Sequence, residues 1–512
     1  MTAVAPRDAR RLTPLLLAGM GTAGLLIGAP FGAEGIAFGV LFFVLSIVLA
    51  ARDVTVPVLT WTHALAAYFL LVWLLPIKLY RLPVTLPFNL EPYRLVLLAL
   101  VLAWLASLLA GWGRMTAAGH GRALLLLGGV SLGSLLVNYD SLAPGGLDSQ
   151  AIKPISYFLS VLLAFVLVAS VVHSLRDIDS LVRALVVGGT LVALAAIWQS
   201  RQGYNVFDHL ADWIPVLVEQ ERDVQMIRGG NIRVYASAQH AIELGVELLM
   251  MFPLALYLTS RAASKRRSRL WLLASMVVVI GALATVSRTT VVMLVTMSIV
   301  AVWLRGREVT RFWPLLLVLP FVVHYVAPGT LGGIYKAFFP EEGLVSDLNV
   351  RAGEGGSGRL ADIEPGLDLW ERKPILGHGL GSQFATGEDP GSSGIVQSPT
   401  EGIIFDDQYL NTLVSLGILG LVATVWFVWG AAGKLGRAAR RRAGPQADLF
   451  AACSVSCAGY AASMLLFDSF AFVQSTLMFF LIAALGLRAR ELSKQESVAV
   501  GRFGAVRFPG IG

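Results

Sequence analysis

Two aspartates, Asp406 and Asp407, stand where polar sequence meets a long apolar segment, in "FDDQYLNTLVSLGILG". A carboxylate at the edge of a membrane can act as a general base and take a proton from a sugar hydroxyl. The structural alternative is capping, because Asp is a good N-cap and acidic groups are favoured at a helix N-terminus. Capping explains one of the two aspartates more readily than both. His324 and His378 are weaker candidates for the base, since an isolated histidine is more often structural.

Two arginines supply the opposite charge. Arg288 lies in "ATVSRTTVVML", where two apolar runs meet with almost no loop between them. A guanidinium at that depth is costly unless it faces a polar cavity and has a partner, and its planar fork suits a phosphate group. Arg233, in "GGNIRVYASAQHAIELG", is a second cation near the membrane surface. For Arg233 a lipid-headgroup contact is an equal alternative, and for Arg288 the alternative is a topology anchor.

Three further polar residues follow Arg233 at helical spacing. His240, Glu243 and Glu247 occupy positions i, i+3 and i+7, which places them on one face of a helix. Carboxylates inside a membrane normally pair with another group, and the two arginines are the natural partners. We therefore expect an ion-pair brace that orients the arginines, in preference to direct catalysis by these carboxylates.

The elements that hold these residues are predicted to be membrane helices. The 512 residues have a mean hydropathy of +0.70 and only 14% charged residues, whereas soluble globular domains carry about 25%. The predicted fold is an all-α, polytopic integral membrane helical bundle of about fourteen transmembrane helices with a large extracytoplasmic loop. The apolar runs are near 13–31, 35–51, 57–76, 93–112, 122–138, 154–174, 181–200, 239–259, 270–287, 289–305, 312–328, 408–431, 448–466 and 470–488.

Basic residues set the predicted orientation. With fourteen spans, both chain ends and the Lys/Arg-rich loops near 261–269, 305–311 and 432–447 fall on one side, which the positive-inside rule makes cytoplasmic. This placement accounts for the net charge of +7 without a nucleic-acid partner. The N-terminal segment is interpreted as a retained helix rather than a cleaved signal peptide. The Pro-rich segment 77–92, with Lys78 and Arg81, falls outside and is interpreted as re-entrant or interfacial.

The largest loop and several short motifs can be interpreted from their residues. Loop 329–407, which contains Trp370, is predicted to be ordered and functional, since structureless runs of that length are uncommon. "GHGLG" at 377–381 is interpreted as a turn, and no phosphate-binding P-loop is present. Cys453 and Cys457 are interpreted as packing residues, because a zinc or disulfide framework needs more sulfurs.

The chain is expected to divide into six parts. They are N-terminal transmembrane helices (1–200), an extracytoplasmic loop (201–238), central transmembrane helices (239–328), the large extracytoplasmic loop (329–407), C-terminal transmembrane helices (408–488) and a cytoplasmic tail (489–512).

Four pieces of sequence carry a resemblance to a known family. They are "RVYASAQHAIELG", "VSRTTVVML", "SGRLADIEPGLDLWERKPILGHGLGSQF" and "FDDQYLNTLVSLGILG", within residues 225–430. In these pieces the chain resembles the O-antigen ligase/polymerase superfamily of bacterial membrane glycosyltransferases. The resemblance implies transfer of a glycan from an undecaprenyl-diphosphate carrier to a glycan acceptor on the extracytoplasmic face, with no cofactor and no metal.

The resemblance also assigns roles to particular residues. It implies that Arg233 and Arg288 hold the diphosphate, and Arg359 in "SGRL" matches a recurrent arginine of the large loop. Ligases of the family carry a histidine at the position that, counting back from Gly417, is Asp406 in this chain. Because the chain departs from the ligase pattern there, we expect a polymerase in which Asp406, or failing that Asp407, is the base.

Two other functions stay open at this point. One is a transporter, such as a flippase for lipid-linked glycans, and the other is a membrane component of a polysaccharide-export complex. Transporters often show internal repeats and midplane binding groups, and no convincing repeat is visible in this sequence. The expected location is the bacterial inner (cytoplasmic) membrane, multi-pass, with both termini cytoplasmic. The expected partners are the lipid bilayer, the lipid-linked donor, the acceptor and polysaccharide-export machinery.

Overall fold

The protein is described here from a computed structural model. The described residues are 60–83, 90–142, 148–220, 227–228, 231–310, 313–339, 360–382 and 405–504. Within them, nine helices are long and apolar enough to cross a membrane. The helices of the bundle are α3 (Trp61–Leu74), α4 (Pro92–Leu109), α5 (Gly121–Leu142), α6 (Asp148–Val171), α7 (Leu175–Gln202), α9 (Ala241–Arg261), α10 (Lys265–Ala284), α11 (Arg288–Thr310), α12 (Trp313–Val326), α16 (Gln408–Arg440), α17 (Pro445–Ser463) and α18 (Val473–Gly504).

Each predicted span from segment 57–76 onward corresponds to a helix, but α3, α12 and α17 are not among the nine described helices that are long and apolar enough to cross a membrane. The predicted spans 13–31 and 35–51 lie outside the described residues, so the total of fourteen stays a prediction. The main difference is α18, which continues to Gly504 although the predicted span ends at 488. Its extension is rich in Ala, Arg, Glu, Leu and Lys, which are good helix formers even where hydropathy no longer favours a membrane. A polytopic helical membrane protein is therefore what the described chain forms.

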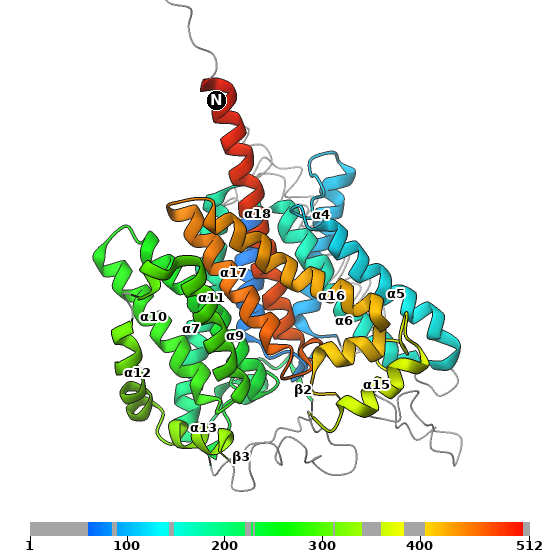
Figure 1. Cartoon of the computed structure of the whole chain (residues 1–512), viewed down its shortest axis with the longest axis horizontal. Helices are drawn as coiled ribbons and strands as arrows, with labels where there is room; N and C mark the ends of the chain where they lie inside the picture. The colour runs from blue at the N-terminus through cyan, green and yellow to red at the C-terminus, as the bar shows by residue number, and fades with distance from the viewer. Residues whose placement is uncertain are drawn as a thin grey trace, which may run out of the picture.

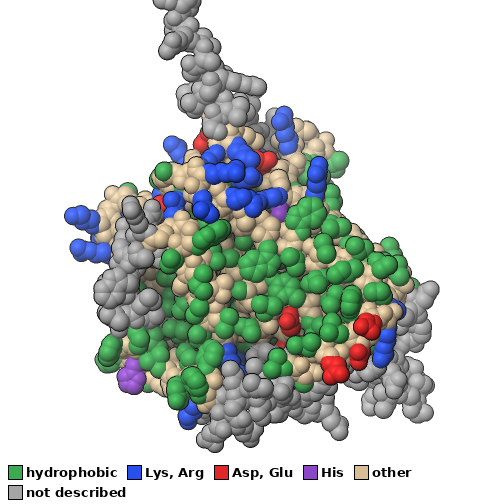
Figure 2. Space-filling view, viewed as in Figure 1, with side chains coloured by type: hydrophobic (Ala, Val, Ile, Leu, Met, Phe, Trp, Pro, Cys, Tyr) green, Lys and Arg blue, Asp and Glu red, His purple; other side chains and the backbone are tan. Residues whose placement is uncertain are grey.

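The two ends of the bundle differ in what they carry. The loop end holds the short strands β1 (Tyr80–Arg81), β2 (Val218–Glu219), β3 (Ile227–Arg228) and β4 (Asn231–Ile232), the helices η3 (Val206–His209), α8 (Leu210–Trp213), α13 (Thr330–Phe338) and α15 (Ile363–Arg372), and η4 (Ser469–Ala471) between α17 and α18 (Figure 1). The basic end holds short turns and the projecting end of α18. Figure 2 shows Lys and Arg gathered at the basic end, above a broad apolar surface.

Two predicted loops meet at the loop end through a small sheet. Strand β1 pairs antiparallel with β2, with Tyr80 opposite Glu219 and Arg81 opposite Val218. Strand β1 belongs to the segment 77–92, and β2 belongs to the predicted loop 201–238. Their pairing supports the expectation that both segments lie on the same side. Strands β3 and β4 form a separate hairpin within the second loop.

Helix α18 is the centre of the bundle. In its most apolar stretch, 94% of the residues are buried inside the structure. This is unusual for a surface helix and typical of a helix surrounded by others. Phe480 stacks on Phe427 of α16 at 4.7 Å, and Phe479 stacks on Tyr460 of α17 at 4.4 Å. Phe165 of α6 meets the edge of Phe427 at 5.5 Å. This aromatic core fixes the positions of the helices whose loop-end termini carry the polar residues.

Candidate active site

Arg233 lies in the segment that joins β4 to α9, and it is only 3% exposed. The segment is held by α7, because the Gln199 side-chain oxygen accepts hydrogen bonds from the backbone N–H groups of Tyr235 (3.2 Å) and Ala236 (2.9 Å). The Asn205 side chain donates to the Ala236 carbonyl at 2.9 Å. A guanidinium enclosed this far is withdrawn from lipid headgroups, which favours the site interpretation of Arg233.

His240 is the N-cap of α9 and the neighbour of Arg233. Its Nδ1 accepts a hydrogen bond from the Ile242 N–H at 3.2 Å, and its Nε2 lies 3.4 Å from a guanidinium nitrogen of Arg233. Arginine has only N–H donors and a neutral imidazole has one acceptor nitrogen, so a given tautomer of His240 accepts either from Arg233 or from the Ile242 N–H. The contact places the Arg233 guanidinium at the start of α9, where the first helix N–H groups also favour an anion.

Arg288 is the first residue of α11 and is 7% exposed. Only Thr285, Val286 and Ser287 separate α10 from α11, and Val286 adopts a left-handed φ of 49°. This tight connection packs against α9 at Gly245, where a Cβ would stand 2.1 Å from Oγ1 of Thr290. The N-terminus of a helix already favours anions, so a guanidinium at this position adds to a site for negative charge.

Glu243 joins α9 to α18 at the loop end. One carboxylate oxygen accepts hydrogen bonds from the backbone N–H groups of Gln474 and Ser475, both at 3.1 Å, and the other accepts from Gln239 N–H at 2.9 Å. The first N–H groups of a helix have no partner inside that helix, so Glu243 caps α18 from a neighbouring element. The described contacts thus give Glu243 a bracing role, with backbone N–H groups as partners.

Glu247 lies one turn deeper in α9. Its side chain is fully buried, and no described residue donates a hydrogen bond to its carboxylate. Together with His240 and Glu243 it follows the predicted helical spacing. His240, however, stands at the cap and not on the helical face, because its ring is used to end the backbone of α9.

The two aspartates before α16 have different surroundings. Asp407 is the N-cap: one of its oxygens accepts hydrogen bonds from the backbone N–H groups of Tyr409 (2.7 Å) and Leu410 (3.2 Å). Burial raises the pKa of Asp407, and these two hydrogen bonds act in the opposite direction. Asp406 is partly exposed and does not serve as the cap. Capping thus accounts for Asp407, which leaves Asp406 as the better candidate for chemistry.

Asp468, in the connection between α17 and α18, is the site residue that sequence reasoning missed. It is buried, and burial raises its pKa to about 7, against hydrogen bonds from Asn411 and Ala471 and the charge of Lys78. The negative charge of Asp406 raises the pKa of Asp468 further, which places the two carboxyls in one electrostatic environment. An acidic residue inside the apolar run "LLFDSFAF" was the available signal.

Lys78 brings a buried cation to the same place. It adopts a left-handed φ of 63°, and its ammonium donates to the Ala471 carbonyl at 2.9 Å. Its backbone N–H donates to Glu91 at 2.9 Å. Burial lowers the pKa of Lys78, whereas the negative charges of Glu243, Glu91 and Asp468 raise it. The predicted segment 77–92 therefore contributes to the polar cluster and does not merely surround it.

The start of α16 is tied to the α17–α18 connection by Gln408. Its backbone N–H donates to the Met464 carbonyl at 2.9 Å, and its side-chain oxygen accepts from the Phe470 N–H at 2.6 Å. Asp406, Asp407 and Asp468 are thereby held at one edge of the bundle. Through Glu243, the N-terminus of α18 connects this acidic edge to the start of α9, where Arg233 and the packing site of α11 lie.

Helix α16 is interrupted at Gly417, which has φ 68° and ψ −170°. Residues 374–379 fill the interruption: His378 N–H donates to the Val414 carbonyl (3.0 Å), Gly379 N–H to Ser415 (2.8 Å), and Ile418 N–H to Pro374 (2.9 Å). From α5, Ser134 donates to the Leu376 carbonyl at 2.6 Å. The "GHGLG" segment is thus the predicted turn, and it also satisfies backbone groups that a broken membrane helix would expose.

The remaining candidates lie elsewhere. His378 is buried with Nε2 2.8 Å from the Leu369 carbonyl, and His324 is exposed on α12. Trp370 of α15 donates from its indole N–H to the Pro374 carbonyl at 3.1 Å, which stabilises the turn. Arg359 lies outside the described residues. Among the described residues, no cluster of three or more His, Cys, Asp or Glu could hold a metal ion.

Comparison with protein families gives a match over part of the chain. Residues 273–425 match the family model described as O-Antigen ligase. No curated protein matches the chain. The matched region contains Arg288, the described part of the large loop, both aspartates before α16 and the interruption at Gly417, whereas Arg233 precedes it. Over residues 273–425 the chain is thus similar to the O-antigen ligase family, in agreement with the resemblance that its motifs carry.

Proposed function

We propose that the protein is a polymerase-type membrane glycosyltransferase that moves a glycan from a polyprenyl-diphosphate carrier to a glycan acceptor. The observation that supports this most directly is that Arg233 and Arg288 are buried beside α9, and that α9 is connected through the start of α18 to the acidic edge formed by Asp406, Asp407 and Asp468. A transferase of this kind needs positive charge for the leaving diphosphate and a base for the acceptor. Both are available at the loop end of the bundle.

The diphosphate would lie between the start of α9 and the start of α11. The Arg233 guanidinium stands beside His240 at the start of α9, and Arg288 adds its charge to the N-terminus of α11. Negative charge grows on the bridging oxygen as the bond to the sugar breaks, and fixed donors lower the energy of that state. Because these groups are already buried and held by Gln199 and Gly245, little reorganisation is needed when the charge develops.

The acceptor hydroxyl would be deprotonated by Asp406. Its O–H proton moves to the carboxylate, its oxygen forms a bond to the anomeric carbon, and the carbon–oxygen bond to the diphosphate breaks. The electron pair of that bond leaves with the polyprenyl diphosphate, so charge and atoms balance. Asp407 caps α16 and is not the proposed base. Asp468 lies close enough to Asp406 for the charge of Asp406 to raise the pKa of Asp468.

The polymerase reading over the ligase reading follows from the residue at the start of α16. The ligase pattern has a histidine there, and this chain has Asp406. The loop end is proposed to face away from the cytoplasm, because Lys and Arg gather at the opposite end. The membrane is proposed to be the bacterial inner membrane, the carrier undecaprenyl diphosphate, and Arg359 of the large loop a further contact to the substrate.

The test is a reconstituted reaction. Purified protein in lipid nanodiscs is given a lipid-linked oligosaccharide, and the products are separated by size. A ladder of longer lipid-linked products supports a polymerase, and a single transfer to a different acceptor supports a ligase. A flippase would change neither product size nor linkage but would move fluorescent substrate across proteoliposomes, and that result would overturn the proposal.

A further inference from the structure

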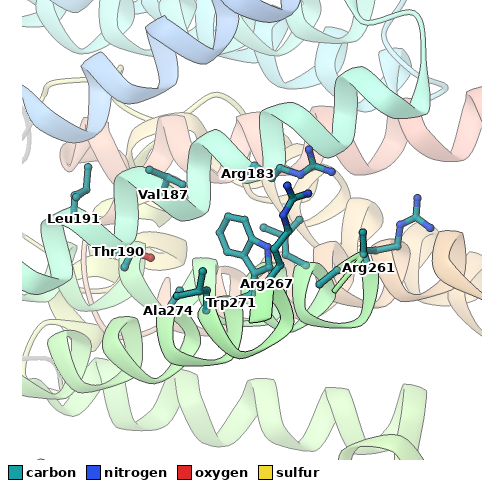
Figure 3. Close-up of a pocket in the computed structure, with 12 residues that line it drawn as sticks. Arg183, Val187, Thr190, Leu191, Arg261, Arg267, Trp271 and Ala274 are labelled. Carbon is teal, nitrogen blue, oxygen red and sulfur yellow. The ribbon is translucent and has the colours of Figure 1, made fainter. Parts of the chain in front are cut away.

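A second site lies at the basic end, opposite the candidate active site. A cavity of ≈ 500 Å³ opens between α7 and α10, next to the last turn of α9. Three arginines stand around it, Arg183 of α7, Arg261 of α9 and Arg267 of α10, and Figure 3 shows Arg183 and Arg267 directed toward the same end of the cavity. We call this cavity the α7–α10 groove.

The charge at this end of the groove favours an anion. Arg261 is shared with Asp179 at 3.4 Å, but neither Arg183 nor Arg267 has an acidic partner in the part of the chain that the structure describes. Helix α10 also begins here, with Lys265, Arg266 and Arg267 in place of any acidic residue in its first turn. Cations at a helix N-terminus oppose the helix dipole, so a bound anion would offset both sources of positive charge.

Below the arginines the groove is apolar. Val187 and Leu191 follow Arg183 at i+4 and i+8, while Leu270 and Trp271 follow Arg267 at i+3 and i+4, so each helix presents one face in which a cation precedes apolar side chains. Both helices start at the basic end, and eight residues of α7 descend about 12 Å. Val187, Leu191 and Leu270 are 40%, 47% and 56% exposed, so the groove is open to the surrounding lipid.

We propose that the α7–α10 groove binds one anionic phospholipid from the adjacent leaflet. Its phosphate lies between Arg183 and Arg267, and an acyl chain follows Val187 and Leu191 toward the bilayer centre. Trp271 lies at the headgroup level, where tryptophan is common in membrane proteins. Basic pockets between transmembrane helices suit anionic headgroups, and a cationic rim above an apolar wall fits an amphiphile better than a free ion. This proposal does not depend on the proposed function.

Native mass spectrometry of the full-length protein tests it. Phosphatidylglycerol or phosphatidylcholine is added to the detergent-solubilised protein, and retained lipid is counted. Two double variants remove the same charge: R183A/R267A from the groove, and R266A/R269A from exposed positions of α10 that do not line it. A third variant, V187W, fills the apolar wall and keeps all the arginines.

The expected result is retention of phosphatidylglycerol by the native protein and by R266A/R269A, with at least a fivefold loss in R183A/R267A and in V187W. Equal loss in the two double variants would mean that general charge attracts the lipid, and equal retention of phosphatidylcholine would mean that the headgroup is not recognised. If V187W left phosphatidylglycerol binding unchanged, the groove would be a site for a free anion, and the proposal would be overturned. Decaprenyl phosphate is added as a competitor at equal concentration. If it displaced phosphatidylglycerol, the groove would be a site for the carrier lipid, which would also overturn the proposal. Each variant is first shown to elute as a folded species.

Discussion

The loop end and the basic end of the bundle both carry charge, but they hold it in different ways. At the loop end, Arg233, Glu243 and Asp468 are buried, and Glu243 accepts hydrogen bonds from the backbone at the start of α18. At the basic end, Arg183 and Arg267 are exposed beside an open groove. Burying a charge is costly unless its surroundings compensate it. The charges at the loop end therefore depend on the protein groups around them, whereas those at the basic end are accessible to solvent and lipid headgroups.

The difference separates two meanings of a charged residue in a membrane protein. Clustered, exposed cations set orientation and attract anionic lipid. Single, buried charges at helix ends require a polar cluster to hold them, and such clusters are where chemistry is expected. Substitutions at the loop end, compared with matched changes where the chain offers them, test this difference.

Arg288→Ala is expected to have the largest effect. Removing one group that stabilises transition-state charge lowers kcat by about 10²–10³, and Arg288→Lys should recover only part of this because it lacks the planar fork. Glycan extension in nanodiscs is the measurement, with insertion checked by size-exclusion chromatography. Arg266→Ala, a charge removed from the basic end, should leave extension unchanged; a folded Arg288→Ala protein with native activity would exclude Arg288 from the site.

Asp406→Asn should lower kcat by about 10²-fold, which is a typical contribution of a general base. Asp407→Asn is the matched change next to it. Asparagine caps a helix about as well as aspartate, so Asp407→Asn should retain both stability and most activity. Single-turnover rates on lipid-linked substrate distinguish the two variants. A larger loss in Asp407→Asn than in Asp406→Asn would move the base to Asp407.

Gly417→Ala should destabilise the folded protein by about 2–3 kcal/mol, because a left-handed residue with a clashing Cβ is strained. The Cβ would stand 2.2 Å from the Ile375 carbonyl oxygen. Gly433→Ala, in the same helix, is the control: its Cβ would meet only the end of Arg437 at 3.4 Å. Tm in detergent measures both. Equal Tm values for the two variants would mean that the interruption of α16 is not needed for stability.

Asp468→Asn should have the smallest effect, visible as a change in pH dependence. The pKa of Asp468 is raised to about 7 in the folded protein, so the folded state binds this proton more tightly than the unfolded state does. Its contribution to the free energy of unfolding is present in acid and is lost as pH rises through about 7, amounting to about 1 kcal/mol between pH 6 and pH 8. Tm is measured as a function of pH between pH 6 and pH 8, and its decrease with pH should be smaller in Asp468→Asn than in the native protein. An unchanged slope of Tm against pH would mean that another group causes the pH dependence.

Local sequence signals predicted the helices and several of the site residues. Apolar runs identified α9, α11 and α16, because membrane helices satisfy their own backbone and leave a continuous hydropathy signal. Capping by one of the two aspartates was expected from their residue type and position before such a run, and the structure shows that Asp407 is the cap. Arg288 was recognised as a costly charge and Arg233 as a cation near the membrane surface, and the structure buries both.

Long-range contacts could not be predicted in the same way. Lys78 donates to Ala471, and Glu243 caps Gln474 and Ser475 across more than two hundred positions of sequence. No local pattern specifies such a partner, because any helix N-terminus could have accepted the carboxylate. The described hydrogen bonds of Glu243 come from backbone N–H groups, and the expected ion-pair brace to the arginines stays a prediction. The interruption of α16 was also missed, since Gly417 in an apolar run is compatible with an unbroken membrane helix.

The interruption at Gly417 has a mechanical consequence. Backbone hydrogen bonds fasten residues 374–379 to both sides of the gap in α16, and Trp370 ties α15 to the same turn. Because these bonds reach both sides of the gap, they hold the two parts of α16 at a fixed angle instead of leaving a hinge at Gly417. The first part of α16, which begins at Gln408, is thereby kept in a fixed orientation relative to α15.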